Sequence, residues 1–131
     1  MPTEAQWEKA AWGTDGRVYP WGNAKPNDKF CNFNGNVGDT TSVDKYPKGA
    51  SPYGCLDMAG NVCEWVADWY DDNYDQSSPK QNPTGPKSGI NRVLRGGYWY
   101  DNQVDVRVAI RDGGYQDGLH FGCRLVFPIR S

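Results

Sequence analysis

The chain has 131 residues, and its 14 Lys and Arg against 16 Asp and Glu leave a formal net charge of −2. This length allows one domain, and the slight acidic excess argues against nucleic acid as a partner, because nucleic-acid-binding surfaces are normally basic. No run reaches the ~18 apolar residues of a membrane span, so we expect no membrane-spanning segment. The sequence does not assign the chain to a compartment.

Turn-forming and aromatic residues dominate the composition. With 16 Gly and 9 Pro, the chain is too rich in turn formers for a helical bundle. Six Trp and eight Tyr can still build a core, since each buried aromatic side chain removes roughly 150–250 Å² from water. We therefore expect an α+β domain with much irregular chain, short antiparallel strands and little helix.

The pattern predicts a helix over residues 3–12. Thr3 can cap its N-terminus, and Gln6 stands three residues later, as a capping box requires. Trp7 begins an apolar face with helical spacing, and Gly13 can end the helix.

Two long segments carry turn and loop signals instead of periodic apolar residues. Residues 16–51 contain four Pro or Gly turn clusters, and residues 71–91 are polar and rich in Asp and Pro. We expect the second segment to be a surface loop. An irregular stretch as long as the first is uncommon unless something holds it in place.

Residues 62–69 alternate between two faces, which predicts a strand, although the same residues also satisfy a helical period. Three further strands are predicted at 91–95, 106–111 and 120–127. In the last of these, every second residue from Phe121 onward is apolar, a pattern typical of a half-buried strand.

Cysteine chemistry offers no strong site. The four cysteines are Cys31, Cys55, Cys63 and Cys123. They form no CxxC pair, and the single histidine, His120, is far in sequence from three of them. A zinc site would need long-range convergence, so reduced structural cysteines are the favoured interpretation. One disulfide is the alternative interpretation if the protein reaches an oxidising compartment.

A candidate cation site surrounds a Gly-Asn turn. Asp57 and Glu64 lie seven residues apart on either side of Gly60 and Asn61. Carboxylates and main-chain carbonyls are the ligands that calcium prefers. A solvated turn capped by Asp57 is the alternative. A second acidic-amide cluster lies in the long loop, at Asn32, Asn34, Asn36 and Asp39.

Residues 98–120 have the composition of a binding surface instead of a catalytic centre. The chain has no nucleophile elbow, no neighbouring Cys–His pair and no phosphate-binding glycine loop. Tyr, Asp, Asn and Gly together are typical of antibody-like contact surfaces. The alternative is aromatic core with polar turns, which we expect for Trp99. The candidate ligand-binding residues are Tyr98, Tyr100, Asp101, Asn102, Asp105, Asp112, Tyr115, Asp117 and His120.

Five motifs in serial order carry a resemblance to a known family. They are PTEAQWE (2–8), YPWG (19–22), YGCLDMAGNVCEW (53–65), RVLRGGYW (92–99) and GCR (122–124). Together they resemble the formylglycine-generating enzyme, or sulfatase-modifying factor, family. The resemblance implies a variant of the C-type lectin fold over residues 1–131, without the family's usual N-terminal part.

The resemblance also implies structural calcium. One ion would lie at the motif matching residues 57–64, held by the side chains of Asp57 and Glu64 and the carbonyls of Gly60 and Val62. A second would lie near Asn32 and Phe33, completed by Asp39. We expect calcium as a structural cofactor.

Copper is not expected. The family's enzymes hold copper with two cysteines shortly after the Gly-Gly-Ser-Trp motif, and the matching positions here are Asp101 and Val106. Neither side chain supplies the thiolate that soft copper(I) needs. The favoured hypothesis is a non-catalytic module that displays residues 98–120 to a protein or other macromolecular ligand, similar to the variable proteins of diversity-generating retroelements. The alternative is a copper-dependent formylglycine-generating oxidoreductase, or a fragment of one.

Overall fold

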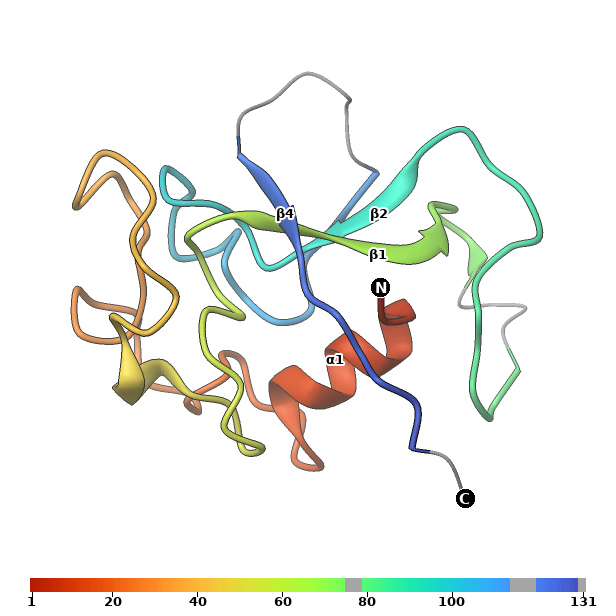
Figure 1. Ribbon diagram of the computed structural model, residues 1–131, viewed down its shortest axis with the longest axis horizontal. Coiled ribbons are helices and arrows are strands. Elements are labelled where there is room, and N and C mark those ends of the chain that lie inside the picture. The colour runs from red at the N-terminus through yellow and green to blue at the C-terminus, as the bar shows by residue number, and fades with distance from the viewer. Residues whose placement is uncertain (75–78, 114–119, 130–131) are drawn as a thin grey trace.

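A computed structural model describes residues 1–74, 79–113 and 120–129 of the chain. Helix α1 (Glu4–Trp12) lies on one side of a small sheet, and most of the remaining chain is irregular (Figure 1). Between α1 and the sheet the long loop contains only a short 3-10 helix, η1 (Pro47–Gly49). The predicted α+β class with little helix is confirmed.

The predicted capping box starts helix α1. The Thr3 hydroxyl accepts a hydrogen bond from the Gln6 N–H at 3.2 Å, and the Gln6 side chain accepts one from the Thr3 N–H at 2.9 Å. The Asp68 carboxylate accepts a third, from the Glu4 N–H at 2.7 Å, where the helix dipole favours negative charge. Within the described parts of the chain, no helix combines the length and apolar composition needed to cross a bilayer.

Strand β1 (Cys63–Trp69) is central in a four-stranded sheet of order β3-β2-β1-β4. Its sequence also allowed a helix, and the strand prediction is confirmed. β2 (Arg92–Arg95) pairs with β1 in antiparallel fashion, and β3 (Arg111–Asp112) does the same with β2. Because Glu64, Val66 and Asp68 are the buried residues of β1, this face of the sheet lies toward α1.

The strand predicted at 106–111 is wrong for residues 106–110, because the two-residue strand β3 overlaps the predicted range only at Arg111. Residues 102–110 form successive turns, with local hydrogen bonds such as Val106 N–H to Asn102 C=O. Val106 and Val108 are both fully buried, but in two different core clusters. Their alternation therefore reflects a turn that inserts two side chains into the core, and not the pleat of a strand.

The strand predicted at 120–127 is also shorter, since β4 comprises only Phe121–Cys123. It pairs with β1 in parallel, which corrects the expectation of antiparallel strands throughout. The half-buried pattern is wrong beyond β4, where Leu125 is 69% and Phe127 87% exposed.

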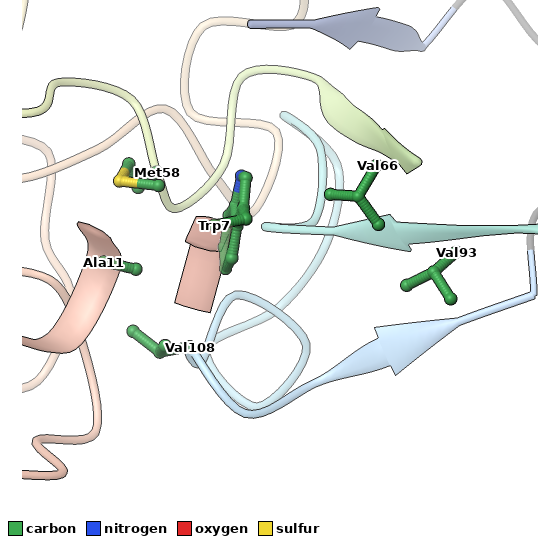
Figure 2. Packing of buried hydrophobic residues seen from close by; sticks show 6 residues of the cluster. All are labelled: Trp7, Ala11, Met58, Val66, Val93 and Val108. Atoms are coloured by element: carbon green, nitrogen blue, oxygen red, sulfur yellow. The ribbon is translucent and has the colours of Figure 1, made fainter. Parts of the chain in front are cut away.

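The core has two apolar clusters. The first lies between α1 and the sheet, where Trp7 and Ala11 of the helix meet Val66 and Val93 of the two central strands (Figure 2). The second lies under the long loop and is formed by Tyr19, Cys31, Phe33, Ala59 and Val106. Aromatic burial thus organises the irregular half of the chain as well as the regular half.

Candidate functional site

Residues 98–105 form a loop that follows β2 directly, and neighbouring turns hold it. The Trp99 N–H donates to the Asn61 carbonyl at 3.0 Å, and the Trp99 carbonyl accepts from the Gly35 N–H at 2.8 Å. The Asp101 carbonyl accepts from the Asn34 N–H at 2.8 Å. These contacts fix the backbone of the loop to the Gly-Asn turn and to the long loop.

Aromatic side chains cluster on this loop and meet the chain entering β4. The Tyr98 ring stacks on His120 at 4.4 Å between centroids, and Trp99 meets both rings edge-on at 5.9 Å. Tyr100 is 66% exposed. Trp99, which we expected in the core, is only half-buried. Of the other predicted ligand-binding residues, Tyr115 and Asp117 lie outside the described residues.

A cavity of about 320 Å³ opens beside the loop, on the side of the sheet away from α1. Burial raises the pKa of Asp101 above its ordinary value, the Tyr98 N–H opposes this shift, and the nearby Asp105 and Asp112 carboxylates add to it. The predicted residues Asp101, Asp105 and Asp112 therefore come together. The cavity is lined by these three and by Cys63, Leu94 and Ile110, among others.

The two positions that correspond to the family's copper cysteines have different environments. Asp101 lines the cavity, whereas Val106 is fully buried in the second core cluster. Cys63 also lines the cavity, but burial raises the pKa of its thiol to about 12, so the thiol is protonated at neutral pH. One carboxylate, one buried valine and one protonated thiol do not fit a copper site with two thiolates.

Glu64, a predicted calcium ligand, has both carboxylate oxygens engaged by other side chains. Arg124 donates to the two oxygens, each at 2.6 Å, and the Trp7 indole N–H donates to one of them at 2.8 Å. Arg124 also donates to the Leu56 carbonyl at 2.9 Å. A guanidinium group thus supplies the positive charge that we expected from a cation beside Glu64.

Asp57 stands at the other end of this predicted site, with a left-handed backbone (φ 56°). Burial raises the pKa of its carboxyl to about 6, Arg124 opposes the shift, and Glu64 adds to it. The side-chain amide of Asn61 lies 3.4 Å from one carboxylate oxygen. Gly60 and Val62 form the turn between the two acids, where Gly60 also has a left-handed backbone.

Two asparagines that we did not predict as a pair hold the long loop against this turn. The Asn61 N–H donates to the Asn32 carbonyl at 2.9 Å, and the Asn61 side-chain oxygen accepts from the Thr41 N–H at 2.9 Å. The Asn32 amide donates to the Asp39 carbonyl at 2.8 Å. The signal for Asn61 was its Gly-Asn turn, since asparagine tolerates the left-handed backbone seen here (φ 66°).

The second predicted calcium position retains one buried oxygen without a partner. Asn32 is completely buried, and its side-chain oxygen accepts no hydrogen bond from the described residues. The Phe33 carbonyl accepts from the Asn36 N–H, and the Asp39 side chain accepts from the Thr40 N–H. No group of three or more His, Cys, Asp or Glu side chains in the described ranges is arranged to hold a metal ion.

Comparison with known proteins identifies the family. The model of the sulfatase-modifying factor enzyme 1-like domain matches residues 1–129. The chain belongs to this family. This match confirms the resemblance to the sulfatase-modifying factor family that the five serial motifs predicted.

Curated relatives share this domain within longer proteins. The chain is 45% identical over 114 residues to the serine/threonine-protein kinase pkn1 of Chlamydia pneumoniae, covering 85% of this chain and 18% of the kinase. It is 38% identical over 146 residues to the formylglycine-generating enzyme of Streptomyces coelicolor, covering 94% and 45%. The chain thus spans less than half the length of either relative.

Among solved structures, Treponema denticola variable protein 1 superimposes on the chain with a TM-score of 0.73 and 30% sequence identity. The likeness covers 94% of this chain and 45% of that protein. The family fold therefore occurs, in a closely similar form, in a protein named for its variability.

The Glu64–Arg124 pair generates a stability prediction. Glu64→Gln leaves the Arg124 guanidinium beside a neutral side chain, so we expect a loss of roughly 3 kcal/mol in unfolding free energy, the low end for a buried pair. Arg124 is the more accessible partner, with a side-chain exposure of 27% against 6% for Glu64. Urea denaturation of the single variants and of Glu64→Gln/Arg124→Met measures the coupling. Additive effects in the double variant would contradict the pairing.

Proposed function

We propose that this chain is a non-catalytic binding module that holds a protein or other macromolecular ligand on the surface formed by residues 98–120. The observation that carries the proposal is the environment of Val106. A side chain sealed in the second core cluster contributes nothing to chemistry at the cavity where Asp101 lies. The position that corresponds to a copper cysteine is therefore part of the core. The surface residues beside it are available for contact with a ligand.

The anchored 98–105 loop supports a contact surface. Its backbone is held by Asn34, Gly35 and Asn61, and Asn102 caps the following turn by accepting from the Val104 and Asp105 N–H groups. Binding therefore needs little ordering of the backbone, which lowers its entropic cost. Tyr98 and Tyr100 offer large amphipathic contact areas. The likeness to variable protein 1 supports the same role.

A copper-dependent oxidoreductase of the formylglycine-generating type is the rival function, and the similarity to the Streptomyces coelicolor enzyme favours it. An oxidoreductase would need a second thiol at the cavity, and four free cysteines are available in the chain. Cys31, however, is buried in the second core cluster, where burial raises the pKa of its thiol to about 12.

A direct assay separates the two functions. The copper-loaded protein, incubated with a cysteine-containing sulfatase peptide in air, is expected to leave the cysteine unchanged. The measurement is aldehyde formation by mass spectrometry, with a formylglycine-generating enzyme as positive control. Turnover above the copper-only background, abolished by Cys63→Ser, would contradict the proposal and establish the oxidoreductase.

A binding surface should also tolerate change without loss of the fold. Substitutions at the exposed Tyr100, Val104 and Asp112 are expected to alter the unfolding free energy by less than ~0.5 kcal/mol each. Val106→Ala, as the buried control in the same segment, should cost about 2 kcal/mol. Thermal melting measures both. Equal losses at the exposed and buried positions would show that the surface is structural.

Calcium is proposed as a structural cofactor, with the second position as the better fit. The unpartnered Asn32 oxygen is a hard ligand, and the Phe33 carbonyl and Asp39 carboxylate are the other ligands that the family resemblance supplies. Bound calcium would neutralise acidic charge and tie the long loop to the Gly-Asn turn. At the first position Asp57 is the available carboxylate, since Glu64 is engaged by Arg124.

Metal removal tests this proposal. Free calcium at ~100 times its dissociation constant should stabilise the fold by roughly 2.7 kcal/mol, and a chelator should remove this gain. Asp39→Asn should weaken the calcium effect, whereas Asp57→Asn should leave it intact if the second position is the site. Differential scanning fluorimetry measures the shift. Identical melting temperatures in calcium and in chelator would contradict a calcium role.

A further inference from the structure

We infer that Asn34, in the long loop, is a deamidation site whose reaction is held back while the 98–105 loop is anchored, and whose isoaspartyl product loosens that loop. The inference goes beyond the proposed function and does not depend on it, because it concerns the chemistry of one backbone turn. It is carried by the residue that follows Asn34, by the exposure of the Asn34 side chain and by the hydrogen bonds of two backbone N–H groups.

The sequence supplies the reactive pair. Asn34 is followed by Gly35, and no other asparagine of the chain precedes a glycine. Glycine has no Cβ atom to shield its backbone nitrogen. That nitrogen attacks the side-chain amide carbon of Asn34, a new C–N bond forms, and the side-chain nitrogen leaves as ammonia. Water then opens the resulting succinimide ring, so the reaction is a hydrolysis and needs no oxidant or cofactor.

The surroundings of Asn34 leave its side chain available for this reaction. The side chain is exposed and has no hydrogen-bond partner among the described residues. Asn32 and Asn61, in contrast, are buried. Their side-chain amides donate to backbone carbonyls of the long loop, at 2.8 Å and 3.2 Å. Water therefore reaches the Asn34 amide, whereas the fold retains the amides of the other two.

The anchored loop holds the attacking nitrogen. The Gly35 N–H donates to the Trp99 carbonyl at 2.8 Å, and the Asn34 N–H donates to the Asp101 carbonyl at 2.8 Å. The attack needs a Gly35 nitrogen that has lost its proton, and such a nitrogen would face the lone pairs of the Trp99 oxygen. It would lose a hydrogen bond and gain a repulsion. Deamidation therefore requires the 98–105 loop to separate from the turn first, by a local opening.

Further contacts keep the turn and the loop in one arrangement. Asn34 (φ 54°) and Gly35 (φ 66°) both have left-handed backbones. The Asn36 N–H donates to the Phe33 carbonyl at 3.0 Å and closes the turn. The Tyr100 ring lies against Gly35, since a Cβ atom there would lie 3.4 Å from Tyr100 Cδ2. The closed arrangement thus protects Asn34 as long as the loop stays in place.

The isoaspartyl product changes the backbone itself. In this product the chain runs through the former side chain of Asn34, which adds one methylene group before Gly35. The two N–H donors then no longer have the spacing that reaches the Asp101 and Trp99 carbonyls together. The other contacts of the loop, such as the Trp99 N–H with the Asn61 carbonyl, remain. The loop therefore loosens without unfolding of the domain.

Site-resolved rates test the protection. The protein is aged at neutral pH, folded and in urea, and peptide mass spectrometry measures deamidation at each asparagine. We expect Asn34 to be the fastest site in urea, and its rate to be at least tenfold lower in the folded protein. Asn36, which is also exposed but precedes Val37, is the internal control and should react slowly in both states.

A matched pair of variants separates opening of the loop from global unfolding. The Asp101 carboxylate accepts from the Tyr98 N–H at 2.9 Å and closes the turn that begins the loop. Asp101→Ala removes this acceptor, whereas Asp101→Asn keeps an acceptor oxygen and makes the same change in charge. Below the melting temperatures of both variants, Asn34 should react at least threefold faster in Asp101→Ala than in Asp101→Asn.

Hydrogen exchange tests the product. The isoaspartyl form is separated from aged protein by ion-exchange chromatography, and Asn34→Asp provides the same charge on a normal backbone. We expect the Gly35 amide to exchange at least fivefold faster in the isoaspartyl form than in Asn34→Asp, because its bond to the Trp99 carbonyl is lost.

Four results would each overturn the inference. A slow reaction of Asn34 in urea would show that the pair is not reactive, and equal rates in the folded and unfolded chain would show no protection. Equal rates in Asp101→Ala and Asp101→Asn would separate the reaction from the loop. Equal exchange in the isoaspartyl form and in Asn34→Asp would show that the product leaves the loop anchored. The aldehyde assay and the melting of the surface variants test the proposed function independently.

Discussion

The contact among Glu64, Arg124 and Trp7 determines how the regular elements assemble. Glu64 is 5% exposed, and a buried carboxylate is stable only when it is paired and hydrogen-bonded. Arg124 follows β4, so the ion pair keeps this strand beside β1, and Trp7 brings the middle of α1 onto the same carboxylate. One acidic side chain thus connects the helix, the central strand and an edge strand.

The turn before Glu64 transmits this order to the irregular half of the chain. Asn61 contacts the backbone of Asn32 and Thr41 in the long loop and of Trp99 in the 98–105 loop, two segments without regular structure. Gly60 allows the close approach, because a Cβ atom there would lie 2.2 Å from the Asn32 carbonyl oxygen. These contacts place the loops relative to the sheet, although no ladder of strand hydrogen bonds joins them.

This architecture separates the residues that stabilise the fold from those of the proposed binding surface. In the 98–113 segment Val106 and Val108 are buried, while Tyr100, Val104 and Asp112 remain accessible. Substitutions at the accessible positions leave the anchoring contacts intact, which suits a surface that must change without unfolding. The same separation explains why the proposed function is binding: the core has taken over a position at which an enzyme of the family would place a reactive thiol.

Local sequence patterns determined the features that depend on local physics. Thr3 and Gln6 predicted the start of α1 because a capping box involves only neighbouring residues, and the alternation in residues 62–69 predicted β1 because a buried face repeats every second residue. The serial motifs predicted the family and the fold. The composition of residues 98–120 placed Asp101, Asp105 and Asp112 on one candidate surface, though not in one cavity.

Only the tertiary structure decided the partners of the charged and apolar side chains. The sequence predicted Glu64 as a calcium ligand. In the structure its carboxylate accepts hydrogen bonds from Arg124, 60 residues later. Val106 and Val108 looked like alternate residues of a strand because alternation reports burial and not hydrogen bonding. The sequence also did not predict the parallel direction of β4 or the exposure of Leu125 and Phe127. A sequence encodes which side chains prefer burial or charge compensation, but the identity of the partner depends on which distant segments the folded chain brings together.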